Sequence, residues 1–219
     1  KSYYLVYADM SQSIDDIFYA DGCPEMVFNV GIDFLRNNEI EPWAKVIGQI
    51  VDPLKIQARG KGLSFGIWFQ PHGLALLSKI PQVEFQNQSL PAEEFLTTAL
   101  LDSIGNLLLD NRISQLIALL NGYFEKLASE KSQKKGLQLL QFATAELMKP
   151  SSSISLNSLA DRSNVSSRYL QKLFLEKVGL RPKQLQRIAR FQKGLSHVSI
   201  FGDRPSTSAT YQAGYFDQS

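Results

Sequence analysis

The chain has 219 residues, 44% of them hydrophobic and 20% charged, a composition typical of soluble globular proteins. This length allows two hydrophobic cores of about a hundred residues each. Its apolar runs, such as residues 107–109 and 116–120, fall far short of the roughly 20 residues of a membrane-spanning helix, so we expect no membrane association. The single cysteine, Cys23, excludes an internal disulfide and favours a cytoplasmic location.

The first hundred residues show short runs rich in aromatic and β-branched side chains, separated by Gly, Pro, Asp and Asn. These runs are residues 3–7, 26–30, 45–51, 54–58 and 63–69. Several short strands bounded by turn residues are typical of an antiparallel barrel or sandwich.

From Pro91 the apolar spacing changes to three and four residues, which predicts helices over residues 93–109 and 114–127. Both helices carry an apolar stripe. The stripe residues are Ala99, Leu100, Ile104, Leu107 and Leu108 in the first helix, and Leu116, Ile117, Leu120 and Phe124 in the second. Two interpretations stay open: the stripes form a homodimer surface, or they pack on the barrel of their own chain.

Residues 129–135 are polar and Lys-rich, and we interpret them as a hinge between two domains, residues 1–128 and 129–219. Residues 1–130 hold nine Lys+Arg and sixteen Asp+Glu, a formal charge of −7, whereas residues 131–219 hold fourteen and five, a charge of +9. A basic domain joined to an acidic one is typical of a nucleic-acid-binding protein with a separate partner module. Ordinary two-domain proteins also segregate charge, which is the alternative explanation.

Residues 155–178 predict two short helices joined by a tight turn. The first helix has Leu156, Leu159 and Ala160 on one face, Asn164 and Val165 fill the turn, and Ser166 is placed to cap the second helix. The buried stripe of that second helix is Leu170, Leu173 and Phe174. This is the helix-turn-helix arrangement.

The opposite face of the second helix carries Ser167, Arg168, Gln171 and Lys172. Arg and Lys bind guanine edges and Gln pairs with adenine, so this face has the chemistry to read bases in double-stranded DNA. A small helical domain with a solvated basic face is the alternative interpretation.

A third helix is predicted from Pro182 to about Leu195. Gly179 follows the preceding helix where a left-handed residue is favoured, and Pro182 suits a first helical position. Its apolar positions include Leu185 and Ile188, and Arg187 lies among them.

The order "LA, turn, S-x-R-Y-L-x-x-L-F, four residues, G-x-x-P" resembles the first helix-turn-helix of AraC-type transcription regulators. The resemblance implies two such units joined by one long helix, which corresponds to the segment from Pro182. It also implies that Arg168, Gln171 and Lys172 contact base edges. Ser166, Ser167 and Arg187 are the corresponding candidates for phosphate contacts.

Residues 213–219, AGYFDQS, resemble the turn of the second unit in the same family. The sequence stops there and begins at Lys1, so we expect a C-terminally truncated fragment that lacks one recognition helix. Ala209 and Thr210 depart from the family pattern, and we expect residues after about Ser199 to be poorly anchored.

The N-terminal half resembles the sensor of one branch of AraC-type regulators. The matching positions are Asp21, Gly22, Cys23, Glu25, Val27, Phe28, Gly31, Val46, Ile47, Gly48, Gln49, Gly66, Phe69, Pro71 and Gly73. The resemblance implies a cupin-like barrel that binds a small-molecule effector or mediates dimerisation. The fold expected for the whole chain is therefore α+β: an antiparallel β-barrel, a helical pair over residues 91–128, and an all-α helix-turn-helix domain.

An enzyme is not expected, because the two histidines, His72 and His197, fall in different predicted domains and cannot form a cupin-type metal site. We predict no cofactor and no metal. Cys23 is interpreted as a small buried hydrophobe, and Asp21, Cys23 and Glu25 lie near a turn where a pocket could open. Trp43, Trp68 and Phe69 are interpreted as core residues that could also line a cavity.

The favoured hypothesis is a sequence-specific DNA-binding regulator that responds to a small effector. The competing hypothesis is a ligand-binding or interaction protein whose basic helices dock on an acidic protein rather than DNA. Steep loss of binding to duplex DNA as salt rises would separate the two.

Overall fold

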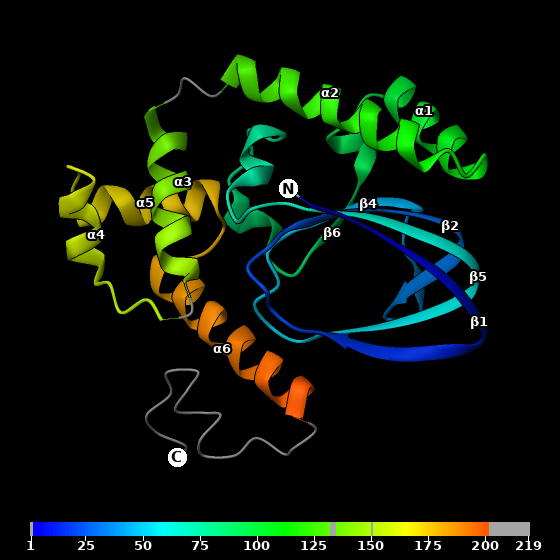
Figure 1. Ribbon diagram of the computed structural model, residues 1–219, viewed down its shortest axis with the longest axis horizontal. Helices are drawn as coiled ribbons and strands as arrows, with labels where there is room; N and C mark the ends of the chain where they lie inside the picture. Colours follow the sequence, from blue (N-terminus) through cyan, green and yellow to red (C-terminus); the bar gives the residue numbers. More distant parts are fainter. Residues whose placement is uncertain (1, 132–134, 150, 202–219) are drawn as a thin grey trace.

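The computed structural model describes residues 2–131, 135–149 and 151–201 and shows a curved antiparallel sheet followed by α-helices (Figure 1). The described strands are β1 (Ser2–Phe18), β2 (Glu25–Arg36), β3 (Glu39–Ile40), β4 (Ala44–Ile47), β5 (Leu54–Trp68) and β6 (Ser89–Pro91). Their order in the sheet is β1-β5-β2-β4-β6, with β3 paired to β2, and every pairing is antiparallel. The prediction of an antiparallel β-sheet in the first hundred residues is confirmed.

Strands β1, β2 and β5 are longer than predicted, and β4 is shorter. Residues 54–58 and 63–69, predicted as separate strands, form the single long strand β5. Gly60 has a φ of 108°, and a side chain at Gly62 would collide with the carbonyl oxygen of Val30, so these glycines let the chain continue as a strand instead of turning. Strand β1 extends to Phe18 because it pairs with β5 over most of its length.

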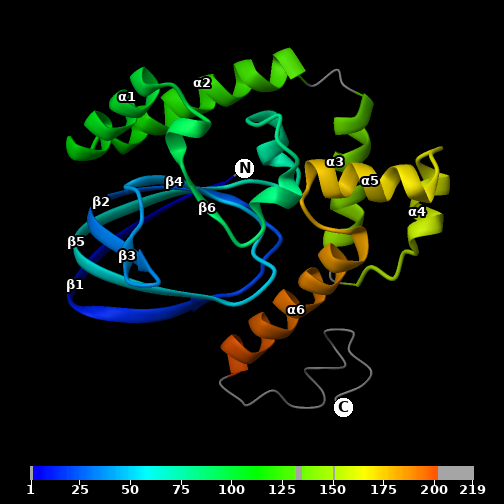
Figure 2. The same cartoon turned by 180° about the vertical axis from the view of Figure 1, so that it is seen from behind.

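Helices α1 (Thr98–Leu109) and α2 (Ile113–Lys131) lie across one side of the sheet (Figures 1 and 2). Helix α1 begins later than predicted because the Thr97 hydroxyl accepts a hydrogen bond from the Leu100 amide, and residues 92–94 form a separate 3-10 turn. Ile104, Leu116 and Leu120 are fully buried in one core with the sheet residues. The stripes therefore pack on the chain's own sheet, which is one of the two predicted alternatives.

A second hydrophobic cluster holds the remaining helices together. These are α3 (Lys135–Met148), α4 (Leu156–Arg162), α5 (Ser167–Lys177) and α6 (Pro182–Phe201). The centre of this cluster includes Leu140, Leu159, Leu170 and Phe174, each with 0% exposure. Of the predicted hinge, residues 129–131 are the end of α2 and residue 135 begins α3. Among the described residues, no helix combines the length and apolarity that crossing a bilayer requires.

The helices meet the connections between strands through a close contact at each of two glycines. A Cβ at Gly22 would lie 2.9 Å from Leu185 Cδ1 and 3.4 Å from Met148 Sδ. At Gly179 a Cβ would lie 2.7 Å from the carbonyl oxygen of Gln82. Both glycines have positive φ, at 78° and 80°, so their backbone conformation also disfavours a side chain. Gln86 donates a hydrogen bond to the Gly179 carbonyl, which fixes the end of α5 against the segment that precedes β6.

Candidate nucleic-acid interface

Helices α4 and α5, joined by a short turn, lie at the end of the molecule away from most of the sheet (Figure 1). Each begins at a serine cap: Ser155 Oγ accepts from the Ser158 amide at 3.0 Å, and Ser166 Oγ accepts from the Tyr169 amide at 3.2 Å. Between them Asn164 adopts a left-handed conformation with a φ of 53°, which Asn tolerates better than most residues. The predicted cap and turn are confirmed.

The buried face of α5 sets which residues point outward. Leu170 and Phe174 are completely buried, and Leu173 is 9% exposed, so three positions at helical spacing anchor the helix on the second core. Burial of such side chains contributes about 1.5–3 kcal/mol each. Gly179, with its positive φ, ends the segment as predicted, and Pro182 begins α6.

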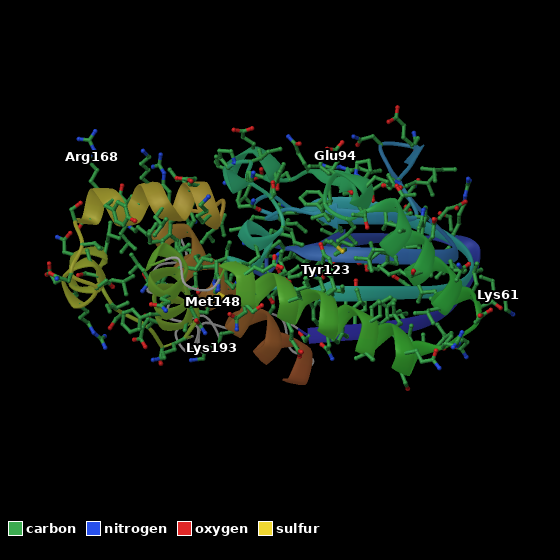
Figure 3. All side chains as sticks on the ribbon, turned by 90° about the horizontal axis from the view of Figure 1, so that it is seen from above. Lys61, Glu94, Tyr123, Met148, Arg168 and Lys193 are labelled. Carbon is green, nitrogen blue, oxygen red and sulfur yellow. The ribbon has the colours of Figure 1, made fainter. Side chains whose placement is uncertain are left out.

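Arg168, Gln171 and Lys172 are all exposed on the outer face of α5. Their spacing of three and four residues places them side by side on one face. Figure 3 shows Arg168 pointing away from the body of the molecule. Within the part of the chain that the structure describes, none of the three side chains makes a hydrogen bond or ion pair with the protein, so all three are available to a partner.

The three residues predicted to contact phosphate, Ser166, Ser167 and Arg187, do not lie together on one surface. Ser166 is occupied as the helix cap, and the Ser167 hydroxyl donates to Asn157 Oδ1 at 2.8 Å. An anion at this point would therefore meet the unpaired amide groups of the first turn of α5. Arg187 is exposed on α6, where it lines a cavity with Tyr19 and Ala20 of the β1–β2 connection, so the structure does not group it with the α5 residues. Its role in phosphate binding stays a prediction.

Part of the sequence-based interpretation lies outside the described residues. The structure does not describe residues 202–219. These residues include the AGYFDQS segment of the predicted second unit and most of the tail that we expected to be poorly anchored.

A second candidate site is a cavity of about 540 Å³ between one end of the sheet and α3. The side chains around it come from four segments: the start of β1, the β1–β2 connection, the end of β5 and helix α3. They are Ser2, Asp21, Cys23, Trp68, Phe69, Gln70 and Pro71 from the sheet region, and Gln141, Thr144, Ala145 and Met148 from α3. A pocket near Asp21 and Cys23 was expected, whereas α3 was not predicted, although Leu140, Ala143 and Leu147 have helical spacing.

Burial dominates the electrostatics of this end of the sheet. It raises the pKa of the Asp21 carboxyl, whose Oδ1 accepts a hydrogen bond from the Cys23 amide at 2.8 Å. Burial and the neighbouring Asp21 raise the pKa of Glu25 to about 8, and Tyr4 donates to Glu25 Oε2 at 3.4 Å. Lys45 is almost fully buried, and burial lowers its pKa, while it makes an ion pair with Glu41.

These surroundings also bear on the cysteine. Burial, with the charges of Asp21 and Glu25, raises the pKa of Cys23 to about 12, so its thiol stays protonated at neutral pH. His72 Nδ1 lies 3.1 Å from Thr144 Oγ1, a contact that joins the sheet region to α3. Among the described residues, no group of three or more His, Cys, Asp and Glu side chains is arranged to hold a metal ion.

The interpretation of Trp43 and Trp68 as core residues is wrong, since they are 40% and 42% exposed. Trp68 packs on Tyr4 with ring centroids 4.9 Å apart, and Trp43 lies against Phe28 at 6.1 Å. Phe69 is buried, as expected, and also borders the cavity.

Comparison with known proteins gives few matches. A family model described as a domain of unknown function, DUF6597, matches residues 1–91, which is the sheet up to the end of β6 and less than half of the chain. No curated protein matches.

Solved structures of ToxT from Vibrio cholerae are similar to this chain in outline. One is 11% identical, covers 98% of this chain and 90% of its own, and has a TM-score of 0.48. ToxT from strain O395 is 11% identical, covers 98% and 88%, and has a TM-score of 0.44. Wild-type ToxT from strain SCE256 with bound unsaturated fatty acid is 9% identical, covers 97% and 86%, and has a TM-score of 0.44. At TM-scores below 0.5 the likeness is too loose to assign a function.

Proposed function

We propose that the protein is a transcription regulator that binds specific sequences in double-stranded DNA through helix α5. The observation that carries the proposal is the exposed row of Arg168, Gln171 and Lys172 on a helix that a turn and a buried stripe hold in a helix-turn-helix. In this role Arg168 and Lys172 donate to guanine edges, and Gln171 pairs with adenine. The first turn of α5, at Ser166 and Ser167, faces a phosphate.

The charge distribution supports this orientation on DNA. Residues 131–219 carry a formal charge of +9 and residues 1–130 carry −7, so phosphate attracts one part of the chain and repels the other. We assign residues 129–219 to a DNA-binding domain and residues 1–128 to a barrel-like domain that binds a small effector. The two separate hydrophobic clusters support this division.

The test is selection of binding sites from a pool of random duplexes, followed by binding titrations on the recovered sequence. Arg168→Ala or Gln171→Ala is expected to weaken the preferred site by about 1–3 kcal/mol and to relax the choice of base at one position. A substitution that weakens all duplexes equally would make that residue a phosphate contact instead. Repeated half-sites among the recovered duplexes would indicate a dimer.

The competing function, docking of the basic helices on an acidic protein, predicts no enrichment of any duplex sequence in the same selection. The failure of selection at low salt, where phosphate contacts are strongest, would refute the DNA-binding proposal.

A further inference from the structure

The cavity between the sheet and α3 is lined by residues from both halves of the chain. Its sheet side is formed by the β1–β2 connection and the end of β5, and its helical side by the face of α3 that carries Thr144 and Met148. Figure 3 shows Met148 where the helices meet the sheet, in agreement with its close approach to Gly22. A volume of about 540 Å³ lies within the usual range for small-molecule sites, about 300–1,000 Å³.

One acidic side chain, Asp21, is among the described residues that line the cavity. None of the described side chains that line it is Lys or Arg, whereas Asp21 presents a carboxyl whose described hydrogen bonds come from the backbone. Glu25 lies just behind this wall, opposite Trp68 on the neighbouring strand. The nearby Lys45 makes its ion pair with Glu41. Ionising a buried carboxyl is costly, and a cation bound beside Asp21 would reduce that cost.

The walls suit a flat or apolar group. Trp68 is half-exposed at the cavity, Phe69 borders it, and the flexible thioether of Met148 closes the helical side. Indole is the aromatic ring that attracts cations most strongly, and Met adapts to ligands of irregular shape.

We propose that this cavity binds a small organic amine, with its ammonium group at Asp21 and its apolar part between Trp68 and Met148. As the effector site of the regulator, this inference rests on the proposed function; as a binding site it stands on the cavity alone. A ligand here touches both the sheet and α3, which supports α5 through the second core, so its binding biases how the DNA-binding helices sit on the sheet.

The binding test uses three probes of similar shape and different charge: 2-phenylethylamine, 2-phenylethanol and phenylacetate. Isothermal titration calorimetry is combined with the fluorescence of Trp68 in a Trp43→Phe background. We expect the amine to bind at least about tenfold more tightly than the other two, the factor that corresponds to one modest charge interaction. Asp21→Asn should lower amine affinity about tenfold, and Asp102→Asn, the same change at an exposed position of α1, should leave it unchanged.

A second series does not depend on the buried Asp21. Ala145 is exposed and lines the cavity, so it accepts longer side chains without repacking the core. Ala145→Lys is expected to weaken the amine and Ala145→Glu to strengthen it, each by a few-fold relative to Ala145→Gln. Equal binding of the three probes, no binding of the amine at about 10 mM, or no order among the three Ala145 variants would overturn the proposal. Amine binding without DNA binding would instead refute the proposed function and leave the amine site intact.

Discussion

Replacing Glu25 by Gln is expected to flatten the pH dependence of stability between about pH 5 and pH 8. The pKa of Glu25 is raised from 4.5 to about 8 in the folded protein, chiefly by burial and then by Asp21, with Tyr4 and Lys45 also facing the carboxyl. The folded state thus holds the proton more tightly than the unfolded state. The stability that the protonated Glu25 carboxyl contributes is fully present below pH 4.5 and is lost as the pH rises through 8.

The magnitude follows from the difference in pKa. Each unit of difference between the folded and unfolded pKa corresponds to about 1.4 kcal/mol. Most of the interval between the two pKa values of Glu25 lies between pH 5 and pH 8. Over this range the free energy of unfolding of the wild-type protein should therefore fall by about 3 kcal/mol more than that of the variant. Gln keeps the shape and a hydrogen-bond partner for Tyr4 but cannot ionise.

The assay is urea unfolding, followed by circular dichroism, of both proteins at half-unit steps of pH. Glu39→Gln makes the same chemical change at an exposed position of β3 and serves as the matched control. Parallel stability curves for the wild type and Glu25→Gln would show that this carboxyl is ionised throughout the range, and the reasoning from burial would then be refuted.

The other predictions concern the helices. Gly179→Ala should destabilise the protein by about 1–2 kcal/mol in thermal unfolding, because its φ is 80° and the new Cβ would lie 2.7 Å from the Gln82 carbonyl; an unchanged midpoint would contradict the contact. Phe174→Ala should cost about 3–5 kcal/mol in urea unfolding, since the ring is fully buried; a loss below about 1 kcal/mol would mean that α5 is not anchored there. Lys172→Ala should weaken binding to the selected duplex. Lys61→Ala removes the same charge from an exposed lysine at the far end of the sheet (Figure 3) and should leave binding unchanged. Equal effects of the two substitutions would mean that the overall charge of the protein, and not a contact of Lys172, determines binding.

Helices α4 and α5 and the turn between them were predictable because their signals are local. Ser166 caps α5 through an amide three residues away, and Leu170 and Phe174 lie one helical turn apart, so the sequence order alone carries the information. Gly179 was assigned from its position after the apolar stripe, and its positive φ confirms that assignment.

The cavity was less predictable because it is built from residues distant in the chain. Asp21, Trp68 and Thr144 come together only when α3 packs on the end of the sheet, and no periodicity records that contact. Helix α3 itself has a helical stripe that the sequence analysis did not assign. The prediction that Trp68 is buried was wrong for the same reason. Its hydrophobicity favours burial, but in the folded chain its indole ring packs on Tyr4 and borders the cavity.

Helix α3 provides the physical connection between the proposed amine site and the proposed DNA-binding helix α5. One face of it, with Leu140 and Leu147, is buried in the core that supports α5, and the face with Thr144 and Met148 borders the cavity. If filling the cavity changes the affinity for DNA by some factor, DNA must change the affinity for the amine by the same factor. We expect a factor of about 5 or more, measured by titrating 2-phenylethylamine with and without the selected duplex. Equal amine affinity with and without the duplex would show that filling this cavity does not act on DNA binding.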